Sequence, residues 1–346
     1  MLITILCIIA AVLLIGLFVT THEFGHYYVG KKCGIGIVEF AVGFGPKLWS
    51  KVKNGIKYSV RAIPLGGFTQ FVGEDDDLPD NPAAFNNAPV WKRFLTILAG
   101  PVMNLIFALL MCMVVLVGYG DAAPYIVEVH EGMPAEEVGL QYGDRIAAVD
   151  GVNIDFYDFD FQKTALGKGL AAYDGESIEL TVDREGEELV LDVPIRDTED
   201  GRMIGISYGV FRRKFSFFEG LRLSFKWMWS IIVTLLETLW GLIAFGKGVE
   251  DVGGIVYTTK IISDVIRTGL ENVFRVACVI SVNLGIFNLL PFPALDGGRL
   301  VFLGIEKITN KGVPKKVEGI INAVGLLILH GLAVLLIFKD FGTIFG

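Results

Sequence analysis

The stretch "LITILCIIAAVLLIGLFVTTHEFGHYYVG", residues 2–30, places two histidines and a glutamate directly after the most apolar segment of the chain. The 20 residues from Leu2 to Thr21 carry no charge. As a helix they would be about 30 Å long, which matches the hydrocarbon core of a bilayer. Ionisable side chains at this depth are costly and usually have a function. The stretch therefore predicts a membrane span that ends in a functional motif of His22, Glu23 and His26.

The overall composition also indicates a membrane protein. Of the 346 residues, 53% are hydrophobic, and the mean hydropathy of +0.56 is too high for a soluble protein of this size. Three further uncharged runs are long enough to span a bilayer: residues 94–119, 276–295 and 319–338. The N-terminal run lacks the basic segment and the cleavage site of a signal peptide, so we expect it to be retained. The sequence predicts a multi-pass α-helical membrane protein with four spans.

The charged residues are distributed unevenly along the chain. Residues 121–210 contain 21 acidic and six basic side chains, a net charge of −15, whereas the whole chain carries −8. Nine Lys and Arg lie in residues 30–93, and five in residues 299–316. Because positively charged loops stay in the cytoplasm, we expect these two segments there, and the N-terminus and the acidic block on the outer side of the membrane. The lipid bilayer is then a partner, and we expect no nucleic acid.

The acidic block predicts a folded α+β domain. It begins with an alternating strand, "PYIVEV", followed by a short helix at residues 134–138 and a Gly-Asp turn into a second strand. Residues 176–195 predict a hairpin around Arg184-Glu185-Gly186. The wording "GMPAEEVGLQYGDRIAAVDG" resembles PDZ domains over residues 121–206, which implies that an extended peptide or a C-terminus binds as an added strand. A spacer domain without a ligand is the alternative, and we expect a linker around residues 211–214.

The HExxH motif predicts a metal site. His22 and His26 are four residues apart, so they lie on one face of a helix. This geometry holds Zn²⁺ with two imidazoles and leaves the intervening Glu23 as the general base. A helix end with solvated His and Glu side chains is the alternative.

A zinc ion needs a third protein ligand, and three other residues near membrane depth are candidates. His330 is alone in the last span, and Glu237 has no ligand-like neighbours. Asp296 lies in "FNLLPFPALDGGRL", where two prolines must break the third span and Gly297-Gly298 permit a tight turn. An N-cap role on the following helix is the alternative for Asp296. Since broken backbone at membrane depth is tolerated where it lines a cavity, we predict Asp296 as the third ligand.

These motifs together resemble the site-2 protease family of intramembrane zinc proteases, in particular the bacterial regulator-of-sigma-factor type. HExxH lies in the first span and N-x-x-P-x-P-x-L-D-G, residues 288–297, in a later one. "VGFGPKL", "AIPLGGF" and "AGPVMN" follow in order between them, so the resemblance covers the whole chain. Longer members have more than one PDZ domain. The resemblance implies a substrate-binding role for Asn288, which would bind the substrate backbone, and for its neighbours Pro291 and Pro293.

A re-entrant hairpin is expected between the first two spans. Residues 57–68 alternate like a strand, and we expect the chain to turn at Gly66-Gly67. The preceding "AVGFGP", with Gly43 and Gly45, would pair with this strand. A substrate helix must unwind before it can be cleaved, and the edge of the hairpin could add the unwound segment as a strand. A plain cytoplasmic hairpin with Gly43 and Gly45 in a turn is the alternative.

The sequence thus predicts a zinc endopeptidase that cleaves the transmembrane helices of single-span proteins, such as anti-sigma factors or signal-peptide remnants. A non-catalytic PDZ scaffold with a structural metal is the main alternative, and an ion transporter is a weaker one. We predict two membrane parts, residues 1–120 and 271–346, which flank the PDZ-like domain (121–206) and a linker with a brace helix (207–270). If residues 225–245 crossed the membrane, Asp296 would reach the wrong side, and their Trp-rich ends favour an interfacial helix.

Overall fold

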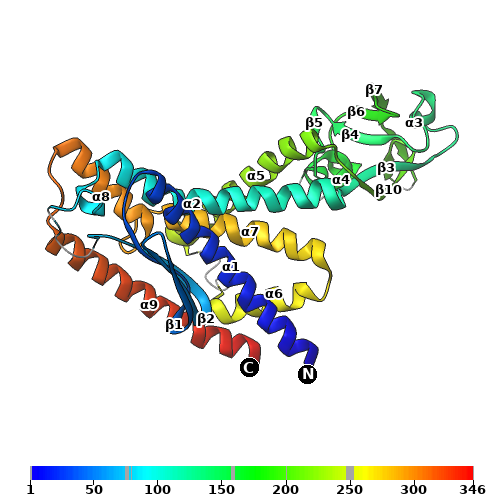
Figure 1. Ribbon diagram of the computed structural model, residues 1–346. Helices are drawn as coiled ribbons and strands as arrows, with labels where there is room; N and C mark the ends of the chain where they lie inside the picture. Colours follow the sequence, from blue (N-terminus) through cyan, green and yellow to red (C-terminus); the bar gives the residue numbers. More distant parts are fainter. Residues whose placement is uncertain are drawn as a thin grey trace. The chain divides into compact units, whose positions relative to one another are not determined.

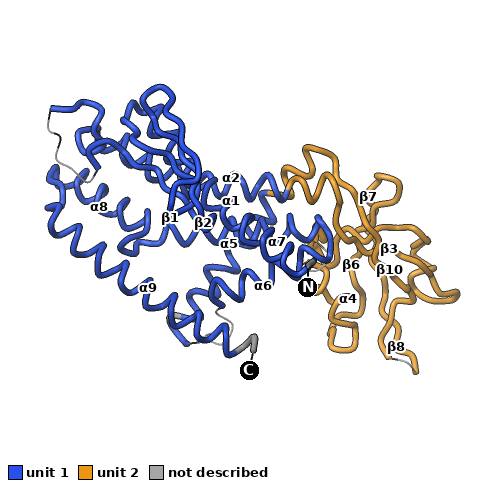
Figure 2. The backbone as a smooth tube through the Cα atoms, turned by 60° about the horizontal axis from the view of Figure 1, so that its bottom comes forward, with its two compact units in different colours: residues 1–112, 225–346 blue, residues 113–224 orange. Residues whose placement is uncertain are grey.

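The computed structural model describes residues 2–74, 78, 80–156, 160–199, 201–246 and 253–345. The chain forms two compact units, which are coloured separately in Figure 2. Unit 1 combines residues 1–112 with residues 225–346, and unit 2 contains residues 113–224. Unit 2 includes residues 121–206, which the sequence predicts as an inserted domain.

Four helices of the described chain are long and apolar enough to cross a membrane, as predicted. They are α1 (Leu2–Lys32), α2 (Val90–Met113, continued by a π-helical turn, Val114–Tyr119), α7 (Leu270–Leu289) and α9 (Lys315–Phe345) (Figure 1). Large apolar side chains stay exposed on their outer faces, and in α9 only 6% of the most apolar window is buried. Such faces require a lipid environment.

Three further helices of the described chain are longer than ten residues. They are α5 (Phe217–Phe245), α6 (Ile255–Ile266) and α8 (Asp296–Thr309). α5 contains the predicted brace segment, residues 225–245, and is not among the four candidate spans. Its interfacial position stays a prediction. α6 contacts α1, α7 and α9.

The third span ends earlier than the apolar run predicts. Helix α7 stops at Leu289, six residues before the end of the run, because Pro291 and Pro293 cannot continue a helix. The chain then forms a non-helical loop, and α8 begins at Asp296. The predicted tight turn at Gly297-Gly298 is wrong, since both glycines belong to the first turn of α8.

Two long strands, β1 (Ile37–Lys53) and β2 (Ile56–Phe71), follow the first span and pair with each other. They are joined at Asn54 and Gly55, whose φ angles of 52° and 78° suit a two-residue Asn-Gly turn. The prediction of a turn at Gly66-Gly67 is therefore wrong, and so is a turn at Gly43 and Gly45: all four lie within strands.

The two strands fold back on themselves and make a small sheet. Residues 39–42 pair with residues 57–60 on one side and with residues 67–70 on the other. The sheet packs against α2 and α8 through a shared apolar cluster of Ile35, Ile37, Ile56, Phe71, Phe85, Ala88, Ile97 and Leu303. Together with the contacts between α1 and β2, this cluster fixes the sheet beside the first span.

A buried carboxylate, Glu39, lies within this sheet. Its oxygens accept hydrogen bonds from Ser59 (2.7 Å) and Arg61 (2.9 Å), and Lys57 lies 3.2 Å away. Burial raises the pKa of Glu39, but the bonds from Ser59, Arg61 and Lys57 outweigh it and lower the pKa to about 2. The carboxylate is therefore charged and paired at every physiological pH.

Unit 2 is an α+β sheet structure. Its main sheet has the order β10-β3-β4-β6-β7, with β5 paired to β4. The strands of this sheet are β3 (Asp121–Val129), β4 (Arg145–Val149), β5 (Val152–Asn153), β6 (Ser177–Arg184), β7 (Glu187–Pro194) and β10 (Ile206–Arg213). Two short helices, α3 (Pro134–Glu137) and α4 (Ala165–Lys168), lie between the strands. β8 (Arg196–Thr198) and β9 (Gly201–Met203) form a separate two-stranded sheet. Ile126, Ile146, Phe161, Leu180 and Val182 are fully buried in the core of unit 2.

The local predictions for unit 2 are confirmed, whereas its predicted end is not. The short helix α3 and the β6–β7 hairpin lie where the sequence places them, and the hairpin turns at Glu185 and Gly186, with φ angles of 55° and 94°. Strand β10 continues to Arg213 and pairs with β3, so the domain does not end at residue 206. The residues predicted as a linker, 211–214, are mostly the end of this strand.

Candidate metal centre

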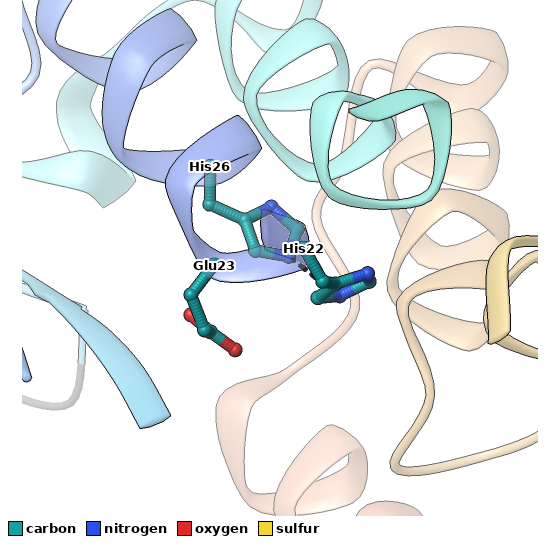
Figure 3. Close-up of side chains that lie close together, drawn as sticks. All are labelled: His22, Glu23 and His26. Atoms are coloured by element: carbon teal, nitrogen blue, oxygen red, sulfur yellow. Dashed lines mark hydrogen bonds between the residues drawn. The ribbon is translucent and has the colours of Figure 1, made fainter. Parts of the chain in front are cut away.

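Helix α1 brings His22 and His26 together on one face, as the four-residue spacing requires. Both side chains are buried, with 7% and 6% of the residue surface exposed. Their rings lie nearly perpendicular, and their Nε2 atoms are 3.1 Å apart. Figure 3 shows the carboxylate of Glu23 beside the two imidazoles, and the ligand atoms of the three residues lie within 4.8 Å of one another.

Asp296 reaches the same point from α8. Its Oδ2 atom lies 3.0 Å from Nε2 of His22 and 3.2 Å from Nε2 of His26. The N-cap of α8 is Leu295, so Asp296 is not the helix cap that was the alternative prediction. His330 is exposed on α9, and its Nδ1 atom is hydrogen-bonded to the carbonyl of Leu326.

The loop before α8 sets the direction of Asp296. Ala294 in this loop has a φ of 71°, and its N–H donates to Oδ1 of Asn322 in α9. A Cβ atom on Gly297 would lie 2.1 Å from the carbonyl oxygen of Leu290, and one on Gly298 would lie 2.4 Å from that of Phe292. The two glycines therefore allow the loop to close tightly over the first turn of α8, which is their role in place of the predicted turn.

The three converging atoms have the geometry of a metal site. Their separations are 3.0, 3.1 and 3.2 Å. Ligand atoms of a tetrahedral zinc ion, at about 2.0–2.1 Å from the metal, are roughly 3.3 Å apart. Oδ2 of Asp296 is buried, and in the described chain its contacts with the two imidazole nitrogens do not have hydrogen-bond geometry. A buried carboxylate oxygen without a partner is costly, and a cation among the three atoms removes that cost.

Helix α2 packs against the rings of the two histidines. Nδ1 of His26 lies 2.9 Å from the carbonyl oxygen of Thr96, and Nδ1 of His22 lies 3.3 Å from the side-chain amide of Asn104. Between these two, a Cβ atom on Gly100 would lie 2.4 Å from the His26 ring and 2.9 Å from the His22 ring. Residues 96, 100 and 104 thus present one face of α2 to the imidazoles.

These three residues of α2 were not predicted as part of the site. The stretch "AGPVMN" contributes to the family resemblance but does not by itself indicate contact with the histidines. The spacing T-x3-G-x3-N, residues 96–104, is the signal that could have indicated a face with a small residue between two polar ones. It could not have shown that this face meets α1.

The sheet approaches the motif on the side of Glu23. The hydroxyl of Thr69 in β2 donates to the main-chain oxygen of Glu23 at 3.0 Å. A Cβ atom on Gly67 would lie 2.6 Å from the carbonyl oxygen of Ala41 and 3.7 Å from Cγ of Glu23. Of the four glycines predicted as substrate-binding, Gly67 is thus placed next to the motif.

The other predicted glycines make their contacts within the sheet, and Asn288 makes its hydrogen bond within its own helix. A Cβ atom on Gly66 would lie 2.1 Å from the Phe44 ring, and one on Gly43 would lie 2.8 Å from the carbonyl oxygen of Ile63, so these glycines pack inside the sheet. Gly45 lies beside the Ile63 side chain. The Asn288 amide donates to the carbonyl of Leu284 on its own helix.

The two prolines lie in the loop between α7 and α8, and α9 contacts Pro293. A Cβ atom on Gly325 would lie 2.6 Å from Cβ of Pro293. Pro291 follows the end of α7 at Leu289 directly. α9 therefore supports the loop that carries Asp296 at two points, Asn322 and Gly325.

Residues 10–332 match peptidase family M50, and the chain belongs to this family. It is similar to proteins named as candidate zinc metalloproteases in three bacteria. The identity is 33% in Clostridium perfringens, over 96% of this chain and 98% of the relative. It is 32% in Agrobacterium fabrum (98% and 96%) and 33% in a Nostoc species (96% and 95%).

The chain is therefore a zinc metalloprotease and a multi-pass membrane protein. The alternatives of a non-catalytic scaffold and of a transporter are excluded by this family membership.

Proposed function

We propose that Nε2 of His22, Nε2 of His26 and Oδ2 of Asp296 are the protein ligands of the zinc ion, and that Glu23 is the general base. The observation that carries this proposal is the convergence of the three atoms at 3.0–3.2 Å in a buried position. Three protein ligands leave one coordination position open, which distinguishes a catalytic zinc site from a closed structural one.

Zinc, when bound, polarises the scissile carbonyl and lowers the pKa of a water molecule to about 7. Glu23 follows His22 directly, and its carboxylate lies within 4.8 Å of the two imidazole ligand atoms. The proposal assigns it the role of base and not of ligand. It takes a proton from the attacking water and transfers it to the leaving amide nitrogen. The bond from Thr69 holds the helical turn of Glu23 against β2, which fixes the position of the base relative to the sheet.

The proposed substrates are transmembrane segments of single-span proteins. A membrane helix must unwind before its carbonyls can be attacked, and its freed amides then need partners that hydrocarbon cannot supply. Residues 67–70 of β2 pair with residues 39–42 along one edge and pass beside Glu23. We propose that their other edge receives the unwound segment as an added strand.

Five other residues have proposed roles in this step. Gly66 and Gly67 keep the backbone of β2 free of side chains beside the motif. Asn288 exchanges its bond to Leu284 for bonds to the substrate main chain, and Pro291 and Pro293 keep the neighbouring segment from continuing as a helix.

The active site is proposed to face the cytoplasmic side, with unit 2 on the outer side as a PDZ-like domain that controls which substrates enter. The segregation of charge supports this: residues 121–210 carry a net charge of −15, whereas the segments around the site are basic. The proposed substrates include anti-sigma factors and signal-peptide remnants. Both present one membrane span, which is the feature that the site would select.

The purified full-length chain in detergent micelles can be incubated with a panel of membrane-spanning peptides, with and without a chelator. Wild type should cleave at least one peptide, and the chelator should stop it. Glu23→Gln should keep zinc and the fold but lose cleavage, because the amide cannot accept the proton of water. Glu237→Gln, a change in another apolar helix, is the matched control and should keep full activity. Substantial cleavage by the Glu23→Gln variant would exclude its role as general base.

A further inference from the structure

One buried polar group near the candidate metal centre has an unsatisfied acceptor. Asn104 on α2 has no exposed surface. Its amide nitrogen lies 3.3 Å from Nδ1 of His22, and its Oδ1 atom is buried without a hydrogen-bond partner in the described chain. Its main-chain oxygen accepts a hydrogen bond from the hydroxyl of Ser281 in α7 at 2.8 Å. Asn104 therefore connects α2 with α1 and α7, but only the nitrogen end of its side-chain amide has a polar neighbour.

The direction of the imidazoles determines what Asn104 must do. Nε2 of each histidine points to the centre that also contains Asp296. A nitrogen that binds a metal carries no hydrogen, so the hydrogen of each neutral ring is on Nδ1 and needs an acceptor. His26 has one, the carbonyl of Thr96 at 2.9 Å.

For His22 the nearest group is the Asn104 amide. If its nitrogen faced Nδ1, two donors would oppose each other while Oδ1 stayed without a partner. Exchange of the two ends of the amide, which have nearly the same shape, removes the contact between two donors and gives Oδ1 a partner, while the NH2 group takes the other position.

We propose that Asn104 is a positioning residue whose Oδ1 accepts the Nδ1 hydrogen of His22 and so presents Nε2 of this ring to the metal. The inference rests on the proposed zinc site and adds a hydrogen-bond partner for one of its ligands, His22. Such partners fix the tautomer and the orientation of a ligating histidine, and their loss weakens metal affinity about 10–100-fold. Thr96 does the same for His26 with its main-chain oxygen, so only the His22 side depends on a side chain that mutation can remove.

The test compares zinc dissociation constants of the full-length protein, measured in micelles by competition with a chromogenic chelator. Asn104→Ala should bind zinc about 10–100-fold more weakly than wild type. Asn104→Asp keeps the acceptor oxygen but has no N–H, so it should bind zinc about as tightly as wild type. The visible spectrum of the Co²⁺-loaded protein gives a second readout: it should change in the alanine variant and stay close to wild type in the aspartate variant.

Two controls separate this role from a merely structural one. Ser281→Ala removes the bond to the main chain of Asn104 but leaves its amide in place, so its zinc affinity should be unchanged. If Asn104→Ala binds zinc as wild type does, if Asn104→Asp is as weak as Asn104→Ala, or if Ser281→Ala is equally weak, the proposal is overturned. His22→Ala tests the zinc site itself. If this variant keeps zinc, the proposed ligand set is wrong. If His22→Ala loses zinc but Asn104→Ala binds it as wild type does, only the role of Asn104 is rejected.

Discussion

Replacement of Gly100 by alanine tests the closeness of α2 to the two histidines. A Cβ atom at this position would lie 2.4 Å from Cε1 and Nε2 of His26 and 2.9 Å from Cε1 of His22, whereas ordinary contacts are 3.4–4 Å. The overlap with the His26 ring is therefore roughly 1 Å. On helix propensity alone the substitution would stabilise α2 by about 1 kcal/mol.

The expected loss of zinc affinity in Gly100→Ala follows from the overlap of the added Cβ atom with the histidine rings. Extra atoms in a packed interior typically cost about 1–3 kcal/mol. In the metal-free protein the rings can move away and avoid most of this cost, but metal ligands must stay within about 0.2 Å of their positions. The strain then returns when zinc binds. Since about 1.4 kcal/mol corresponds to a factor of ten, zinc affinity should fall roughly 5–150-fold.

The assay is zinc competition by a chelator, together with cleavage of a membrane-spanning peptide and thermal unfolding of the metal-free protein. Gly331→Ala in α9 is the matched control, because a Cβ atom there meets nothing within 4 Å. We expect Gly331→Ala to behave as wild type, and Gly100→Ala to lose zinc affinity and cleavage while the metal-free protein stays folded. Wild-type zinc affinity and cleavage in Gly100→Ala would show that α2 is not packed against the ligands in this way.

Three further predictions address the third ligand, the sheet and unit 2. Asp296→Asn should weaken zinc binding and abolish cleavage, while His330→Ala should change neither; zinc analysis of both variants that gave the reverse pattern would identify the other residue as the ligand. The pKa of Glu39 is lowered to about 2, below the usual value of 4.5, so its pairing stabilises the fold fully above pH 4.5, and this contribution is lost as the pH falls towards 2. Unfolding measured from pH 7 to pH 3 should therefore show that Glu39→Gln is less stable than wild type at neutral pH and that the difference shrinks in acid; a constant difference would contradict this. Replacement of residues 121–213 by a flexible linker should leave zinc bound and a span-only substrate cleaved, while selectivity against a substrate with a folded outer domain falls; a folded, zinc-loaded variant that cleaves neither substrate would show that unit 2 takes part in catalysis.

The parts of the site that depend on local geometry could be predicted from the sequence. His22 and His26 share a face because they are four residues apart in a helix, which holds whatever the helix packs against. Asp296 was identifiable because two prolines must end the preceding helix, and a broken chain at membrane depth needs a reason. In the structure the three side chains meet at 3.0–3.2 Å.

The glycines show what local reasoning confuses. A glycine is needed where φ is positive and also where another backbone comes very close, and the sequence looks the same in both cases. The true turn, Asn54-Gly55, has the strongest short hairpin signal in the segment, whereas Gly66 and Gly67 are needed for space inside the sheet. Gly297 and Gly298 have the same role on a helix: each leaves space for a carbonyl oxygen of the preceding loop.

The contribution of α2 depends on how two helices pack, so it could not be derived from either helix alone. The partners of the two rings run in opposite order along the chain: His22 meets Asn104 and His26 meets Thr96. The rings are four residues apart on α1, about 6 Å along the axis, whereas their partners are eight residues apart on α2, about 12 Å. Nδ1 and Nε2 lie on opposite sides of an imidazole, so two rings whose Nε2 atoms converge must have Nδ1 atoms that diverge. The wider spacing on α2 meets this requirement, and Gly100 leaves the space between the partners open for the rings. If His22 and His26 are the proposed zinc ligands, the face of α2 selects which nitrogen of each ring points to the metal.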